Sequence, residues 1–160
     1  MVMETGIPAH DTVQTEVQSV LDATGQGLHV GNFEDFARYF ALPYTVDTFE
    51  EAITVQDALS LRNLFNTARD YYARIGLVHL LRTVLDAAYR SDGTLSATYE
   101  THLITREGTQ TRAPYLCHVE LSKTADFWQV YRTQYAIDDN AHLVSALLGQ
   151  SPMHARRAAG

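Results

Sequence analysis

The sequence predicts an α+β fold, with helices concentrated in its first half and long antiparallel strands in its second half. Before Gly76 the apolar residues mostly recur every three or four positions, as in amphipathic helices, and after Gly76 they alternate, as in half-buried strands. The turn signal at 91–93 and short polar breaks separate the alternating segments. Segregated helices and strands favour α+β over the alternating α/β class. The length of 160 residues fits one domain, residues 1–160, with a core at about 12–138 and frayed ends.

Two helices are predicted at the start of the chain. The first covers residues 12–23, where valines and a leucine recur at helical spacing, and Gly25 with Gly27 is expected to interrupt it. The second begins after Asn32, a favourable N-cap residue with acidic residues in the following turn. It is expected to end before Pro43, because proline disfavours helical geometry in the preceding residue.

Two short strands, at 44–49 and within 50–55, lead into a long third helix. Thr54 with Asp57 resembles a capping box for that helix, which should end just before the alternating pattern begins. Four long strands follow the third helix, at residues 79–90, 95–105, 115–122 and 127–137. After them, a terminal helical turn is expected at 141–148.

Composition excludes several function classes. The net charge of −7, with the 12 basic residues scattered, disfavours nucleic acid and anionic membranes as partners. The single cysteine, Cys117, rules out an intramolecular disulfide and a multi-thiolate zinc site. No apolar run approaches membrane-spanning length, and the opening MVMETGIPAH does not read as a secretory signal, so a soluble cytoplasmic protein is expected. The sequence also lacks phosphate-binding glycine loops and the nucleophile elbow of α/β-hydrolases.

Three local patterns carry a family resemblance. They are the passage GNFEDFARYFALPYTVDTF, a histidine at the head of a strand in GLVHLLRT, and a tryptophan opening a strand in DFWQVYRTQYAI. In this order, over about residues 12–138, they resemble the NTF2-like (nuclear transport factor 2-like) superfamily, which includes ketosteroid isomerase, scytalone dehydratase and SnoaL-like cyclases. The resemblance implies a cystatin-like cone, with three N-terminal helices packed in a curved, mostly antiparallel sheet around a cavity. It also implies frequent dimers through the outer sheet face, but no single function, because this fold hosts enzymes, transport factors and assembly domains.

By this resemblance, His79 matches a histidine that acts as a general base inside the cone of the dehydratase branch. Histidine suits proton abstraction because its ordinary pKa lies near neutrality. That branch orients its histidine with an acidic residue, and His29 stands at the matching position here. Two imidazoles can share a hydrogen bond, but His29 cannot stabilise an imidazolium as a carboxylate would. The alternative is that His79 is a core or rim histidine with its hydrogen bonds satisfied.

Tyrosines supply the candidate ligand contacts. An aromatic pocket with a few hydroxyls suits a flat apolar ligand, and a phenol can donate to a developing oxyanion. The alternative for each of these tyrosines is core packing, with the hydroxyl reaching water. The candidates are Tyr39, Tyr44, Tyr72, Tyr99 and Tyr131. Cys117 is interpreted as a small buried hydrophobe rather than a nucleophile.

Two histidine–glutamate pairs stand out, in YETHLI and in YLCHVELS. Alternate residues of a strand share a face, so matching the apolar faces of the two strands places both pairs on the same, more polar face. Such a set could ligate a divalent metal, but a solvated face or a dimer interface with cross-strand ion pairs is favoured, and no metal is expected. The predicted interface residues are His102, His118, Glu120 and Arg132.

The turn at 91–93 decides which residues of the preceding strand join that polar face. A three-residue turn with Gly93 in the left-handed region would place Arg82 and Asp86 there. A two-residue turn would shift the register by one and point Asp86 inward, beside Tyr99.

Two functions are carried forward. The first is binding of a small apolar or aromatic molecule in the cone, with acid–base chemistry of the isomerase, dehydratase or cyclase type and no cofactor. The second is a non-catalytic homodimeric interaction module that uses the outer sheet face. An open cavity beside His79 favours the first, and a cone filled with side chains favours the second. The sequence does not identify the ligand.

Overall fold

The computed structural model describes residues 10–49, 51–108 and 113–136. Within these ranges the chain forms three helices and six strands. In chain order they are α1 (His10–Val30), α2 (Phe33–Ala37), β1 (Phe40–Asp47), β2 (Ala52–Val55), α3 (Ala58–Arg74), β3 (Leu77–Tyr89), β4 (Leu95–Thr105), β5 (Tyr115–Thr124) and β6 (Phe127–Tyr135). The predicted α+β class is confirmed, and β4 has the bounds that the sequence predicted. The turn expected at 141–148 lies outside the described residues.

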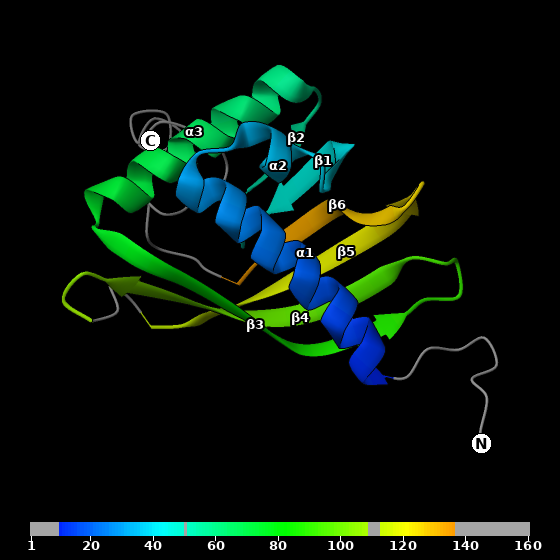
Figure 1. The fold of residues 1–160 in the computed structure, drawn as a ribbon. Coiled ribbons are helices and arrows are strands. Elements are labelled where there is room, and N and C mark those ends of the chain that lie inside the picture. The colour runs from blue at the N-terminus through cyan, green and yellow to red at the C-terminus, as the bar shows by residue number, and fades with distance from the viewer. Residues whose placement is uncertain (1–9, 50, 109–112, 137–160) are drawn as a thin grey trace.

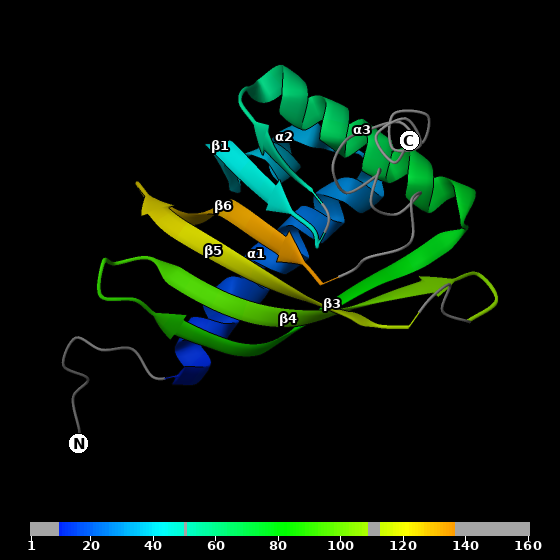
Figure 2. The ribbon, with the colours of Figure 1, turned by 180° about the vertical axis from the view of Figure 1, so that it is seen from behind.

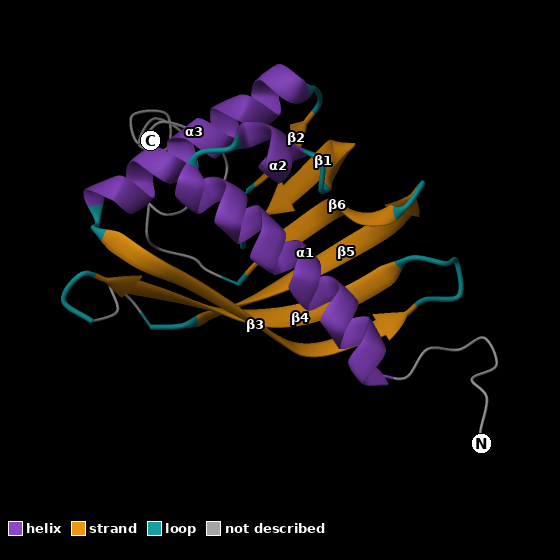
Figure 3. Cartoon of the chain, in the orientation of Figure 1, coloured by secondary structure: helices purple, strands orange, loops and turns teal. Residues whose placement is uncertain are grey.

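The strands form one sheet in the order β2-β1-β6-β5-β4-β3. Every neighbouring pair is antiparallel except β1 with β6, which is parallel. All three helices lie on the same side of this curved sheet (Figures 1 and 3), and in the opposite view the strands pass in front of α1 (Figure 2). We call the helix-covered side the inner face and the other side the outer face.

The predicted break at the two glycines of α1 is wrong, because the helix continues to Val30. These glycines instead permit close packing. A Cβ on Gly27 would lie 3.0 Å from the backbone nitrogen of Phe36, and one on Gly25 would lie 3.0 Å from a guanidinium nitrogen of Arg82. The helix ends at Val30, and the next residue, Gly31, has a φ of 81°, the left-handed geometry that favours glycine after a helix.

The predicted N-cap of the second helix is confirmed, because the side chain of Asn32 accepts a hydrogen bond from the backbone N–H of Asp35. The helix ends earlier than expected, at Ala37, and Pro43 lies within strand β1. Pro43 therefore does not end it. Parallel pairing of β1 with β6 competes for this segment, and the backbone N–H of Val130 donates to the carbonyl of Tyr39.

The predicted capping box of the third helix is wrong, because Thr54 belongs to β2. Asp57 alone is the N-cap of α3, and its carboxylate accepts a hydrogen bond of 2.9 Å from the N–H of Ser60. The helix ends at Arg74, and Gly76, with a φ of 71°, turns the chain into β3.

Strand β3 contains two register shifts that the sequence pattern did not reveal, one between Leu77 and His79 and one between Val84 and Asp86. Gly93 adopts the predicted left-handed conformation, with a φ of 88°, and Asp86 pairs with Thr98 on the outer face. Between Val84 and Asp86 the register shifts by one residue. As a result Arg82 pairs with Thr101 on the inner face, so its predicted place beside Asp86 is wrong. The alternative with Asp86 turned inward is wrong as well.

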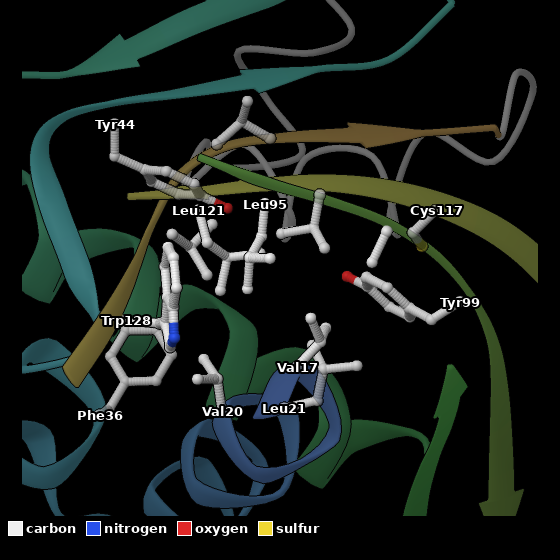
Figure 4. Packing of buried hydrophobic residues seen from close by; sticks show 14 of the residues in the cluster. Val17, Val20, Leu21, Phe36, Tyr44, Leu95, Tyr99, Cys117, Leu121 and Trp128 are labelled. Carbon is white, nitrogen blue, oxygen red and sulfur yellow. The ribbon is translucent and has the colours of Figure 1, made fainter. Parts of the chain in front are cut away.

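The hydrophobic core lies between α1 and the inner face of the sheet. Val17, Val20 and Leu21 point from α1 toward strand residues such as Leu95 and Leu121 (Figure 4). Cys117 belongs to this core and is buried, as predicted.

Candidate ligand-binding site

A groove of about 620 Å³ lies between the helices α1 and α3 and the edge strand β3. Its walls come from three elements: the C-terminal half of α1, the last turns of α3 and the first half of the edge strand β3. Leu28 and His29 contribute from α1, Tyr72 from α3 and residues 77–82 from β3. We call this space the groove.

A much smaller inner cavity, of about 50 Å³, lies behind the groove. The two spaces share Leu28, Tyr72, Leu80 and Arg82 as lining residues, so the inner cavity adjoins the groove along this shared wall. Five tyrosines line the inner cavity: Tyr44, Tyr72, Tyr99, Tyr115 and Tyr135. The cone is therefore largely filled by aromatic side chains, and most of the open space lies at its mouth.

Burial keeps the tyrosines of the inner cavity protonated. It raises the pKa of Tyr44 and of Tyr72 to about 12. The hydroxyl of Tyr44 donates to Oγ1 of Thr133 at 2.8 Å, whereas that of Tyr72 makes no hydrogen bond to another described residue. Tyr72 is thus a neutral phenol with a free donor on the wall that the two spaces share.

Both predicted catalytic histidines border the groove, but neither lies inside the cone. His79 pairs with Ile104 on the outer face, at the exposed edge of the sheet, and His29 is exposed near the end of α1. Within the described chain, neither imidazole forms a hydrogen bond or ion pair with another side chain. No group in this part of the structure orients His79 as a general base requires.

Three arginines line the groove, and the sequence reasoning did not single them out as site residues. The side chain of Arg82 extends from β3 to α1, where its Nη2 donates to the carbonyl of Leu21 and, at 2.9 Å, to Oγ1 of Thr24. The Nε of Arg69 donates to the carbonyl of Leu28 at 2.9 Å. Arg106 is the third, and the acidic lining residue among those described is Asp22.

The predicted tyrosine contacts divide between the two faces. Tyr44, Tyr72 and Tyr99 line the inner cavity, together with Tyr115 and Tyr135, which the sequence reasoning missed. Alternation along β5 carries the signal for Tyr115, whereas Tyr135 faces inward only because a register shift at Tyr131 reverses the alternation that begins at Trp128 and Val130. Tyr39 instead packs on Phe127, with ring centroids 5.7 Å apart, and Tyr131 donates to Glu120 on the outer face.

The outer face carries both histidine–glutamate pairs, as predicted, but they are offset along the strands, because Glu100 pairs with Leu116 and His118 pairs with Thr98. His102 contacts Glu100 at 3.0 Å, and the ring of His118 lies 3.5 Å from the hydroxyl of Thr98. The interface candidates Glu120 and Arg132 already have partners within the chain: Arg90 lies 3.0 Å from Glu120, and Asp47 lies 2.8 Å from Arg132. In the described part of the chain, no group of three or more His, Cys, Asp or Glu residues could hold a metal ion.

A second depression, of about 280 Å³, lies beside β1 and β5 and includes Phe49, Leu116 and His118. Among residues 10–49, 51–108 and 113–136, no helix is long and apolar enough to cross a membrane.

Comparison of the sequence with known protein families finds no match. A search of curated proteins finds no similar sequence either. Solved structures, in contrast, share the architecture. A cystatin-like domain of unknown function from Nostoc punctiforme aligns over 94% of both chains, with a TM-score of 0.62 and 14% identity.

Two further structures are similar over most of their length. An NTF-2-like protein of unknown function from Shewanella oneidensis aligns over 77% of this chain and 98% of its own, with a TM-score of 0.60 and 9% identity. An NTF2-like protein with a cystatin-like fold from Novosphingobium aromaticivorans aligns over 86% of this chain and 89% of its own, with a TM-score of 0.57 and 16% identity. The chain therefore has the NTF2-like, cystatin-like fold.

Proposed function

We propose that the chain binds a small molecule with a flat apolar or aromatic part in the groove. The observation that carries this proposal is the wall that groove and inner cavity share, which combines apolar side chains with the unpartnered phenol of Tyr72. The groove's volume of about 620 Å³ falls within the range of about 300–1,000 Å³ that small-molecule sites occupy.

The groove supports binding more strongly than catalysis. A general base needs an oriented lone pair within hydrogen-bond reach of the proton that it removes. His79 and His29 border the groove, yet no described side chain holds either ring by a hydrogen bond. Acid–base chemistry of the isomerase, dehydratase or cyclase type would therefore require the substrate itself to orient His79.

A groove-filling variant tests the binding proposal. Ala73 lies on the exposed side of α3 and lines the groove, so Ala73→Phe should obstruct the space with little effect on the core. The matched control is Asn66→Phe, at an exposed position of α3 outside the groove.

The measurement is ligand-observed NMR with a library of aromatic and alicyclic fragments, repeated with both variants. The proposal expects binding to the unmodified chain and to Asn66→Phe but not to Ala73→Phe. Fragments that bind all three proteins equally, or none that binds the unmodified chain, would refute it.

The second candidate function is a homodimeric interaction module. It is favoured by exposed leucines on the outer face. Leu81 is 49% exposed and pairs with His102, and Leu116 is 45% exposed and pairs with Glu100. Leu116→Arg should halve the mass measured by light scattering if a second copy covers this face. Leu59→Arg, at an exposed position of α3, is the control. A monomeric mass for the unmodified chain would rule this candidate out.

A further inference from the structure

We infer that the ligand carries an anionic group, of the carboxylate type, which binds the guanidinium of Arg82 at the inner end of the groove. This inference rests on the proposed binding function and specifies its ligand. Arg82 is half-buried and lines both the groove and the inner cavity. A molecule bound in the groove would therefore contact Arg82 on the side that faces the inner cavity.

Arg82 differs from comparable arginines of the sheet in having no carboxylate partner. On the outer face, Arg90 pairs with Glu120 at 3.0 Å and Arg132 pairs with Asp47 at 2.8 Å. For Arg82 the structure records hydrogen bonds from Nη2 alone, to a carbonyl and a hydroxyl of α1, and no acidic oxygen of the described chain lies within 4.0 Å. A half-buried charge without a counterion is costly, and an incoming anion would offset that cost.

The rest of Arg82 remains available to a ligand. A guanidinium has five N–H donors, and the two that Nη2 carries are used toward Leu21 and Thr24. These contacts, and the glycine at position 25 beside them, hold the planar group in place. Nε and Nη1 keep three donors, and each can give a carboxylate oxygen a charge-assisted hydrogen bond, although not the two parallel bonds of one edge, because both such edges include Nη2.

The electrostatics of the groove point the same way. Arg69 and Arg106 also line it, and neither forms an ion pair with a described residue, while Asp22 is the acidic side chain recorded in its wall. Three guanidinium groups against one carboxylate make a locally positive site on a chain whose formal net charge is −7. A cleft lined by one sign of charge raises the local concentration of the opposite sign.

The sizes of the two spaces fix the orientation of the ligand. An inner cavity of about 50 Å³ exceeds the roughly 10–15 Å³ that one water needs on the same measure, so it has room for a small polar head, whereas the groove, at about 620 Å³, has room for a ring. The ring must then lie in the groove against Leu28, Leu77 and Leu80. The carboxylate points inward, where Arg82 and the hydroxyl of Tyr72 can both donate to it.

The test compares two probes of the same shape, 2-naphthoate and its neutral analogue 2-naphthamide, by isothermal titration calorimetry at low salt. Charge-assisted hydrogen bonds should make the acid bind about 10- to 100-fold more tightly than the amide. Arg82→Gln should abolish that ratio and Arg82→Lys should restore part of it. Arg62→Gln, at an exposed arginine of α3 that stacks on Phe33 outside the groove, should leave the ratio unchanged.

A second readout keeps the inference testable if the Arg82 variants unfold. In the unmodified chain, the Nε–H resonance of Arg82 should shift with the acid and not with the amide. If acid and amide bind equally, and Ala73→Phe blocks both, the groove remains a binding site and the anion inference fails. If neither probe binds while neutral fragments do, the anion inference also fails. If nothing binds, the proposed function falls with it.

Discussion

The side chain of Gln18 completes the edge of the sheet, and its removal should destabilise the fold measurably. Strand β3 is the last strand of the sheet, so one row of its backbone groups has no strand partner. Gln18 on α1 supplies one: its Nε2 donates to the carbonyl of Arg82 at 2.7 Å, and its Oε1 accepts from the N–H of Val84 at 3.0 Å. The primary amide thus pairs with β3 as a neighbouring strand would.

Two hydrogen bonds of this kind set the expected magnitude. A net contribution of about 0.5–1.5 kcal/mol for each bond predicts that Gln18→Ala lowers the free energy of unfolding by about 1–3 kcal/mol. The lower half of that range is favoured because water can reach an edge strand and replace part of the loss. For a chain of this length the melting temperature should fall by about 2–4 °C per kcal/mol.

Urea denaturation measures this loss, and amide hydrogen exchange locates it, because the N–H of Val84 should lose protection. Gln14→Ala should cost less, since its Nε2 makes one exposed bond of 3.2 Å, to the carbonyl of Leu85. Ser19→Ala, at an exposed position of the same helix, is the control. If Gln18→Ala is as stable as that control and Val84 keeps its protection, α1 does not act as a strand partner.

Three further predictions follow from burial and capping. Leu121→Ala should lower the free energy of unfolding by about 2–5 kcal/mol in urea titrations, because Leu121 is fully buried in the core. Burial raises the pKa of Tyr44 and Tyr72 to about 12, so their contribution to stability should be full below about pH 10 and lost as pH rises toward 12, with tyrosinate absorbance following unfolding. The N–H of Ser60 holds the pKa of Asp57 below its usual range, so the cap should stabilise the fold at neutral pH and weaken as pH falls through the usual carboxyl pKa. Denaturation midpoints should show this acid loss in the unmodified chain but not in Asp57→Asn, which caps without titrating.

The large-scale fold was accessible to sequence reasoning because its signals are periodic. A change from helical to alternating spacing after Gly76 places the helices and long strands, and Asn32 marks a helix start through chemistry specific to N-caps. The glycines of α1 misled that reasoning because glycine has two roles. Gly27 reads as a helix break by composition, whereas in the structure it provides space for Phe36 to approach.

The candidate site was harder to predict, because an arginine acquires its role from its surroundings. Arg69, Arg82 and Arg106 are separated along the chain, and no spacing rule links them. Arg69 lies near the end of α3 and Arg106 lies just after β4, and the fold brings both beside Arg82 of β3 in the wall of the groove. Tyr115 could have been found by alternation along β5, whereas Tyr135 depends on the register shift at Tyr131 in β6, which alternation alone does not predict.

One residue of β3 largely decides the chemical character of the groove. Without the shift between Val84 and Asp86, the register set at the 91–93 turn would carry back along the strand, placing Arg82 on the outer face and His79 on the inner face. With it, the two exchange faces, and the inner cavity is lined by a guanidinium instead of an imidazole. A bulge reverses the alternation of the residues beyond it, here from Val84 back to His79, where the second register shift of β3 lies, so it replaces an inward-facing imidazole with an inward-facing guanidinium. The same reversal explains why His79, which resembles a dehydratase-type histidine in sequence, faces outward at the sheet edge and not into the cone.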